Sequence, residues 1–256
     1  MSKCIAFIQA RMSSSRFPGK VLEELGGMPT IVFMVERARR ARLLDQVVVV
    51  TSTDASDQPL ADTLARHSID CFRGDLDDVL ARFAAAAARY QATEVMRLTG
   101  DCPLIDPAII DRVIAARRGA DAEYSSNIDP PSYPDGLDVE FCTRAALDRC
   151  AREARAQPER EHVTLWMRGE AAGLKRVNVR AIADCSSLRL TVDYPDDLAA
   201  LRRLADLAGA RFATLDFFEL LRLLDTHREI TDMNLHARNE GLARSLAEVA
   251  AKEASR

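Results

Sequence analysis

The chain has 256 residues, of which 48% are hydrophobic and 29% charged, so it can bury a full core as one α/β domain. Its net charge of −4 gives no overall basic surface, and we therefore expect no nucleic-acid partner. No apolar stretch approaches the ~20 residues that span a bilayer, and the first residues lack the apolar core of a secretory signal. We therefore expect no membrane partner and a cytoplasmic location.

The six cysteines, at positions 4, 71, 102, 142, 150 and 185, form no Cys-x-x-Cys pair. Cys4 and Cys71 lie in apolar runs, as small core residues do, so we expect reduced thiols. A structural zinc site needs cysteines and histidines clustered at short spacings, and these positions do not supply them.

Apolar runs of strand length alternate with amphipathic segments of helix length, which predicts a mostly parallel sheet covered by helices on both faces. In the first half, we expect strands at 4–10, 47–52, 69–72 and 94–99, and helices at 29–43, 59–67, 75–90 and from 106–107 onward. The apolar run at 47–50 lacks polar alternation, so its strand should be buried on both faces.

Residues 124–136 are rich in Asn, Asp, Ser and Pro, which predicts a long connecting loop of the kind that often covers a site. Beyond it we expect strands at 137–142, 174–179 and 188–192, and helices at 143–155, 158–169, 197–207, 215–224 and 235–251. We expect residues 1–256 to form a single domain, with about 124–175 as a lobe and about 210–256 as C-terminal helices. An apolar stripe on the last helix could pack on the domain or on a second subunit, so a homodimer is compatible with the sequence.

The loop at 11–20 follows the first predicted strand and carries three cations and three hydroxyl groups. Guanidinium groups grip phosphate oxygens in pairs, a lysine adds a point charge, and backbone N–H groups between a strand and a helix can hold an anion. Lys20 is followed by Val21, and no glycine lies five residues before Gly19, so the loop is not a Walker A motif. We predict a polyphosphate cradle; the alternative is a solvated basic loop.

Asp101 and Asp193 each follow a predicted strand and precede a helix that begins with proline. Ligands of open α/β sheets bind at the carboxyl ends of the strands, so both carboxylates should lie near the 11–20 loop. Mg²⁺ prefers one or two carboxylates together with phosphate oxygens and water. We therefore predict Mg²⁺ between Asp101 and Asp193, although each aspartate could instead cap the helix after it.

Six stretches of the sequence, in this order, resemble the cytidylyltransferases that activate acidic sugars, including the CMP-KDO and CMP-acylneuraminate synthetases. The branch of spore-coat polysaccharide biosynthesis is the most similar. The stretches are 8–11 with 15–20, 72–74 with 78–80, 97–106, 134–140, 160–164 and 190–193. The resemblance implies an α/β fold with a three-layer, mostly parallel sheet of the nucleotide-diphospho-sugar transferase (glycosyltransferase A-like) type.

The resemblance also implies an activity: CMP transfer from CTP to an acidic sugar or related acceptor, with Mg²⁺ as cofactor and pyrophosphate as leaving group. Such a reaction would serve the biosynthesis of surface polysaccharides or glycoconjugates. An acceptor oxygen would attack the α-phosphorus in line, and the protein would mainly position groups and neutralise charge.

The family pattern assigns roles to several residues. Nucleotide binding falls to Gln9, Ala10, Arg11, Ser15, Arg16, Gly19, Lys20, Arg73 and Asp101; Arg11, Lys20 and Asp101 would be catalytic, and Asp101 with Asp193 would ligate Mg²⁺. The acceptor would lie against the 124–175 lobe and contact Asp138, Glu140, Arg160, Glu161 and His162. Gln9 and Arg73 could instead make backbone bonds at strand ends, and residues 160–162 could pair with one another at the start of a helix. The ordinary pKa of histidine suits a general base, but the pattern does not assign that role to His162.

Two departures from the family pattern leave the acceptor open. CMP-KDO synthetases tend to carry an acidic residue where this chain has Cys102, and the Pro-Thr-Ser-Pro run of many acylneuraminate synthetases is missing. A nonulosonic acid, another sugar acid, a phosphonate or a phosphate-bearing alcohol would each suit.

Three other functions stay open. A sugar-1-phosphate nucleotidyltransferase would show a Gly-x-Gly-Thr-Arg type of loop where this chain has Ala-Arg-Met-Ser at 10–13. A glycosyltransferase would need an Asp-x-Asp metal motif, which residues 75–77 match in form, although dipole stabilisation of a helix also explains those acids. A catalytically silent nucleotide-binding module is the third.

Overall fold

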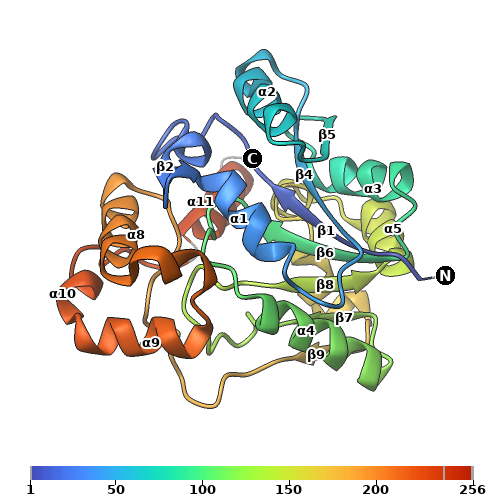
Figure 1. The fold of residues 1–256 in the computed structure, drawn as a ribbon. Helices are drawn as coiled ribbons and strands as arrows, with labels where there is room; N and C mark the ends of the chain where they lie inside the picture. Colours follow the sequence, from blue (N-terminus) through green and yellow to red (C-terminus); the bar gives the residue numbers. More distant parts are fainter. Residues whose placement is uncertain (1, 239, 255–256) are drawn as a thin grey trace.

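The structure is a computed structural model that describes residues 2–238 and 240–254. Its centre is a seven-stranded sheet in the order β5-β4-β1-β6-β8-β7-β9 (Figure 1). The strands are β1 (Cys4–Gln9), β4 (Gln46–Ser52), β5 (Cys71–Gly74), β6 (Glu94–Thr99), β7 (Tyr124–Ser126), β8 (Glu140–Thr143) and β9 (Arg176–Asn178). The first four strands of the chain in this sheet are parallel, and β8 runs antiparallel to both of its neighbours. The predicted α/β class with a mostly parallel sheet is confirmed.

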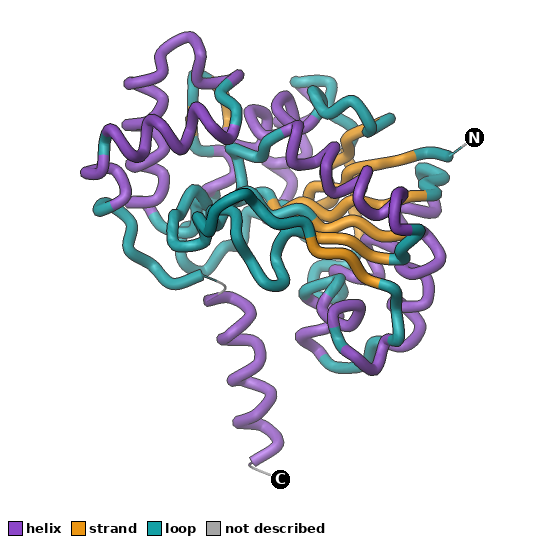
Figure 2. Tube along the Cα trace, turned by 90° about the horizontal axis from the view of Figure 1, so that it is seen from below, coloured by secondary structure: helices purple, strands orange, loops and turns teal. Residues whose placement is uncertain are grey.

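Helices cover both faces of the sheet (Figure 2). Both faces are apolar, and the side chains of β1 alternate between two apolar clusters, one on each face. Ala6 and Ile8 face one cluster, whereas Ile5 and Phe7 face the other. The first cluster includes residues of α1 (Thr30–Ala38), α2 (Gln58–Arg66), α4 (Pro107–Ala120), α8 (Pro195–Ala208), α9 (Phe217–Thr226) and α10 (Arg228–Thr231). The second includes residues of α3 (Val79–Arg89), α5 (Arg144–Glu153) and α7 (Leu165–Arg168). Strand β4 contributes valines to both clusters, as the run at 47–50 predicted.

The remaining elements are short or lie outside these layers. They are the hairpin of β2 (Glu24–Leu25) with β3 (Met28–Pro29), α6 (Gln157–Glu161), α11 (Glu240–Ala254) and the 3-10 turns Lys20–Leu22, Ala55–Asp57, Glu170–Ala172 and Gly209–Thr214. Figure 2 shows α11 projecting from the rest of the chain. None of the helices in the described ranges combines the length and apolar content that crossing a bilayer requires.

Several predicted boundaries were wrong, each for a local reason. The helix expected at 29–43 ends at Ala38, because the backbone N–H groups of Arg42 and Leu43 bond the Asp111 carboxylate at 3.0 and 2.9 Å instead. The helix expected at 75–90 begins at Val79, since the Asp75 carboxylate holds the backbone of the turn before it. The helix expected at 158–169 is divided into α6 and α7 at Val163, whose φ is +50°.

Three further expectations also need correction. The predicted loop at 124–136 begins with β7, which lies inside the sheet between β8 and β9. The helix expected at 235–251 begins at Glu240. The strand expected at 188–192 is absent from the sheet: Leu190 bonds the Asp135 carbonyl at 2.6 Å, and Val192 bonds the Asp101 carbonyl at 2.7 Å. This segment therefore pairs with two loops rather than with a strand.

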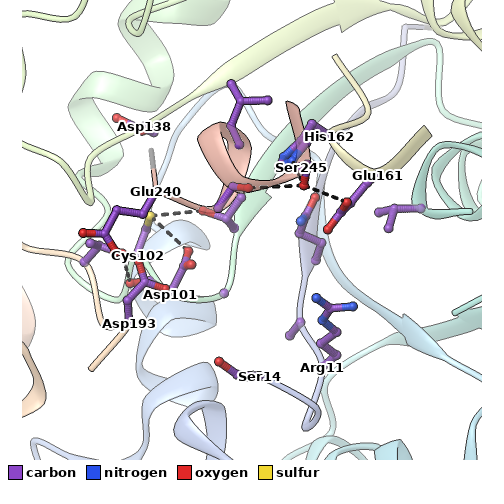
Figure 3. A pocket seen from close by; sticks show the side chains of 18 of the residues that line it. Arg11, Ser14, Asp101, Cys102, Asp138, Glu161, His162, Asp193, Glu240 and Ser245 are labelled. Carbon is purple, nitrogen blue, oxygen red and sulfur yellow. Dashed lines mark hydrogen bonds between the residues drawn. The ribbon is translucent and has the colours of Figure 1, made fainter. Parts of the chain in front are cut away.

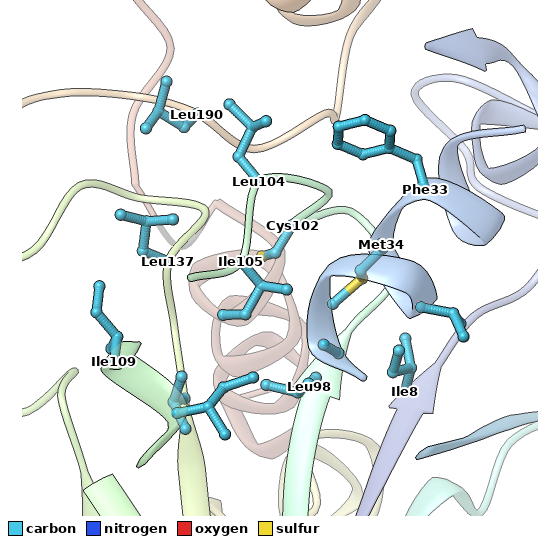
Figure 4. Packing of buried hydrophobic residues seen from close by; sticks show 14 of the residues in the cluster. Ile8, Phe33, Met34, Leu98, Cys102, Leu104, Ile105, Ile109, Leu137 and Leu190 are labelled. Atoms are coloured by element: carbon cyan, nitrogen blue, oxygen red, sulfur yellow. The ribbon is translucent and has the colours of Figure 1, made fainter. Parts of the chain in front are cut away.

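Gly136 allows the 188–192 segment to lie directly against the turn at 134–137. Its φ is +105°, and a Cβ at this position would lie 2.4 Å from the Leu190 carbonyl carbon and 2.5 Å from the Thr191 nitrogen. Leu137 and Leu190 belong to the first apolar cluster, where Ile8 and Leu98 also lie (Figure 4). The glycine therefore fixes the path of the chain that leads to Asp193.

We expect Gly136→Ala to destabilise the protein by roughly 3 kcal/mol or more, because backbone atoms would have to move as well as φ. Gly173→Ala is the matched control, since Gly173 also has a positive φ, +61°, but no atom lies within 4 Å of the point that its methyl group would occupy. The control should lose only about 1 kcal/mol. Urea unfolding of both variants measures the difference, and equal losses would contradict the close approach at Gly136.

Candidate active site

A cavity of about 650 Å³ lies at the carboxyl ends of β1 and β6. Segments far apart in the sequence line it: the 9–20 loop, residues 97–102, 135–140, 157–168 and 191–193, and the first residues of α11. Figure 3 shows Asp101 and Asp193 on one side of this cavity, with Glu161 and His162 on the opposite side. Arg11 and Ser14 lie below them in the same view.

Lys20 holds the two predicted metal ligands together. Its Nζ donates to the Asp193 carboxylate at 2.9 Å, the Val192 carbonyl at 2.7 Å and the Asp101 carboxylate at 3.4 Å. Burial alone would lower the pKa of Lys20, but the two carboxylates outweigh it and raise this pKa. Burial would likewise raise the pKa of Asp193, whereas Lys20 and Arg16 lower it to about 2. The structure thus brings Asp101, Asp193 and the 11–20 loop to one place.

Arg16 adds a second cation to this cluster. Its guanidinium group pairs with the Asp193 carboxylate and lies 5.4 Å from the centre of the Tyr194 ring. Asp193 itself is held through its backbone, because the Asp197 carboxylate accepts the N–H groups of Asp193 and Tyr194 at 2.8 and 2.9 Å. Asp197 is fully buried and pairs with Arg189 at 2.7 Å. Asp193 is therefore held at its carboxylate by Arg16 and Lys20 and at its backbone by Asp197.

The phosphate-loop candidate is anchored by a buried carboxylate that the sequence did not single out. Asp57 accepts the backbone N–H of Met12 at 2.7 Å and the Thr51 hydroxyl at 3.0 Å, which ties the loop to the end of β4. Gly19, with φ +75°, donates its N–H to the Met12 carbonyl at 3.0 Å and so closes the loop on itself. Arg11 is exposed at the cavity, and Ser15, Gln9 and Ala10 also line it.

Two residues predicted at the site lie elsewhere. Arg73 bonds the Ser52 and Asp54 carbonyls at 2.8 and 3.0 Å, which is the strand-end alternative that the sequence left open. Arg160 pairs with the Asp78 carboxylate and bonds the Ala151 carbonyl at 2.8 Å. Neither side chain is among those that line the cavity.

The predicted acceptor carboxylates line the cavity but are engaged within the protein. Glu140 is 3% exposed and accepts bonds from Arg97, Thr164 and, at 2.5 Å, the Tyr124 hydroxyl. Burial would raise the pKa of Glu140, but Arg97 and Arg168 lower it. Asp138 pairs with Arg238, although burial still raises its pKa to about 7.

His162 and Glu161 meet α11 across the cavity. Ser245 donates its hydroxyl to Glu161 at 3.0 Å, and its Oγ lies 3.3 Å from His162 Nε2 (Figure 3). The pKa of His162 is lowered to about 4, mainly because the ring is buried and further because the cations Arg97 and Arg168 lie near it. The ring is therefore neutral at pH 7.

Sequence reasoning missed several residues that line the cavity: Arg82, Arg97, Arg168, Ser245 and Glu240. Arg97 lies in a stretch that carries the family resemblance, directly before the turn at Asp101, so its position was a usable signal. Arg168 and the α11 residues belong to no motif, and only the tertiary fold brings them to the site.

Known proteins resemble this chain along most of its length. Residues 5–217 match the family model described as cytidylyltransferase. The chain is 32% identical over 235 residues to the spore coat polysaccharide biosynthesis protein SpsF of Bacillus subtilis, covering 88% of this chain and 95% of that protein. It is also 32% identical over 229 residues to a 3-deoxy-manno-octulosonate cytidylyltransferase of Methylibium petroleiphilum, covering 85% and 81%.

Among solved structures, a cytidylyltransferase from Leptospira borgpetersenii has a TM-score of 0.86 at 27% identity, covering 93% of this chain and all of that one. CMP:2-keto-3-deoxy-manno-octonic acid synthetase in complex with CTP has a TM-score of 0.62 and covers 80% of this chain and 99% of that one. At 20% identity, this similarity concerns the fold alone. The match over residues 5–217, with a relative aligned along most of both chains, shows that this protein belongs to the cytidylyltransferase family and is a nucleotidyltransferase.

Proposed function

We propose that the protein transfers CMP from CTP to an acidic sugar or a related acceptor, with Mg²⁺ as cofactor and pyrophosphate as leaving group. The observation that carries this proposal is the contact of Lys20 with both Asp101 and Asp193, beside the basic 11–20 loop. Cations for a polyphosphate and carboxylates for a hard metal ion thus share one cavity.

The residues present fit a magnesium ion. Asp101 and Asp193 offer oxygen ligands that already contact one cation, the Lys20 ammonium group, and Asp101 keeps 28% of its side chain exposed toward the cavity. Two carboxylates completed by phosphate oxygens and water are the ligand set that Mg²⁺ prefers. When bound, the ion would supply Lewis-acid stabilisation of the phosphate charge.

The chain's own groups would position the triphosphate. Arg11, Arg16 and Lys20 would bind phosphate oxygens, because they are the cations of the loop at the carboxyl end of β1. Asp57 would keep that loop in place through its bond to Met12, so the cations need little reorganisation. In-line attack by an acceptor oxygen requires mainly this positioning and charge neutralisation.

The acceptor would occupy the other side of the cavity, between α6, α7 and the first turns of α11. Glu161 and His162 line this side, whereas Asp138 lies on the side of Asp101 in Figure 3. A histidine with a pKa of about 4 is a weak base at neutral pH, so His162 would serve as a neutral hydrogen-bonding group.

The direct test incubates the purified protein with Mg²⁺, each of the four nucleoside triphosphates and a panel of acidic sugars, and follows pyrophosphate. Turnover should occur with CTP, should stop on removal of Mg²⁺ by a chelator and should return when Mg²⁺ is restored. Turnover with another nucleotide alone, or without a divalent ion, would contradict the proposal.

Asp101→Asn and Asp193→Asn should each lower kcat for pyrophosphate release roughly 100-fold or more, because each removes one charged ligand at the developing phosphate charge. Asp225→Asn is the control, since Asp225 is exposed, pairs with Arg228 at 3.0 Å and does not line the cavity. The control should keep the rate of the wild-type protein. Near-normal rates in both cavity variants would remove the basis of the metal site.

Lys20→Met should raise the KM for CTP roughly 10–100-fold, because a point charge at the phosphates is lost. The same change leaves two carboxylates without their shared cation, so thermal unfolding must show that the variant is folded. Lys20→Arg retains the charge and should recover part of the affinity. If the folded Met variant bound CTP as tightly as the wild-type protein, Lys20 would not contact the nucleotide.

Burial of His162 predicts a pH dependence of stability. Between pH 6.5 and about 4, the unfolded chain binds a proton at this residue but the folded chain does not, so its contribution to folding falls as the pH falls. From pH 7.5 to 4.5 the wild-type protein should lose roughly 1–2 kcal/mol more than His162→Gln, allowing for partial exposure of the ring. Denaturant unfolding of both proteins at the two pH values measures this, and parallel losses would mean that the ring is not shielded.

A further inference from the structure

We infer that Arg97 and Arg168, placed around the Glu140 carboxylate, form a binding site for an anionic group of the acceptor, on the side of the cavity away from Lys20. The inference rests on the proposed function only in taking the acceptor as the ligand. The site itself follows from two guanidinium groups that are placed around a single carboxylate.

Glu140 can neutralise only one of the two guanidinium groups. Arg97 pairs directly with one of its carboxylate oxygens, while the other oxygen accepts from the Tyr124 and Thr164 hydroxyl groups. Arg168 comes no closer to Glu140 than 4.0 Å, through its Nε. Glu161, the other carboxylate near His162, accepts from Ser245 at 3.0 Å, so among the described residues Arg168 has no direct carboxylate partner in this part of the cavity.

Arg168 is also short of hydrogen-bond acceptors. Its Nε is buried and has no acceptor among the described residues. Arg82, which lines the same cavity, is 3% exposed and has a buried Nε in the same condition. Buried guanidinium donors are costly to leave unpaired. Because Nε is closed to the cavity, an incoming anion would bind the terminal nitrogens of Arg168 and offset the unpaired donor through its charge.

The cluster lies across the cavity from Lys20, while Arg97 also donates to Gln9 at 3.0 Å at the end of β1. Arg97 and Arg168 both act electrostatically on His162, so they lie near that ring. His162 faces Asp101 and Asp193 from across the cavity (Figure 3). A triphosphate held at Lys20 would therefore leave the arginine pair available to a second ligand.

The chemistry of the pair points to a carboxylate or a phosphate. A guanidinium group offers parallel N–H donors that match two oxygens of either anion. The neutral ring of His162 adds a hydrogen-bonding atom without adding charge. An uncharged ligand would leave Arg168 without a directly paired anion.

The test uses small probes that need no turnover. The full-length protein is saturated with CTP and its thermal unfolding is followed with lactate, methyl phosphate or the uncharged ester methyl lactate, at ionic strength matched with chloride. Lactate and methyl phosphate separate a preference for carboxylate from one for phosphate. At roughly ten times its dissociation constant, the preferred anion should raise the midpoint by about 2–4 °C, and methyl lactate should not.

Arg168→Met should abolish this rise, whereas Arg149→Met should retain it. Arg149 is the matched control because it lies on α5, pairs with Glu153 at 3.0 Å and does not line the cavity. An equal rise in Arg168→Met, or none with either anion in the wild-type protein, would overturn the inference. A rise seen only without CTP would assign the arginines to the nucleotide instead.

Failure of the proposed function would look different. In that case CTP itself would not raise the unfolding midpoint, while the anion response and its dependence on Arg168 would still be measurable in the protein without nucleotide.

Discussion

The arrangement of the whole site depends on the Lys20 ammonium group, which contacts the carboxylates of Asp101 and Asp193 near the carboxyl ends of the central strands β1 and β6. Lys20 is 8% exposed, and an ammonium group buried this deeply is stable only with anions close to it. The lysine comes from the first loop, Asp101 follows β6, and Asp193 lies beyond the last strand, just before α8. One electrostatic requirement thus binds three distant parts of the chain.

That requirement is met without a strand at 188–192. The segment is held by Gly136, which permits its close approach to the turn at 134–137, and by bonds to the loop at Asp101. Asp197 then fixes the backbone of Asp193. Irregular backbone is well suited to this task, because its hydrogen bonds go to two loops at once, at Asp135 and at Asp101.

Much of the fold could be predicted from residue patterns. The strand at 94–99 coincides with β6, and the valine run of β4 is buried on both faces as its lack of polar alternation indicated. Periodicity could not show that 188–192 pairs with loops or that Val163 interrupts a helix, since both depend on tertiary contacts. At the site, the positions of Lys20, Asp101 and Asp193 after predicted strands indicated that they lie near one another, although no strand of the sheet precedes Asp193. It could not show that Arg73 and Arg160 bond their own neighbourhoods, or that Arg168 reaches the cavity.

One wall of the cavity is built from α11, which lies beyond residues 5–217, the portion that matches the family model. Ser245 of this helix touches Glu161 and the ring of His162, whereas the lysine and its two acids belong to the matched portion. Arg244 of the same helix also reaches the Ser15 hydroxyl of the 11–20 loop at 3.5 Å. Substitutions in α11 can therefore reshape the cavity on both sides while the lysine and its two acids stay constant. A cavity built in this way can change its outline without losing the charged cluster on which its arrangement depends.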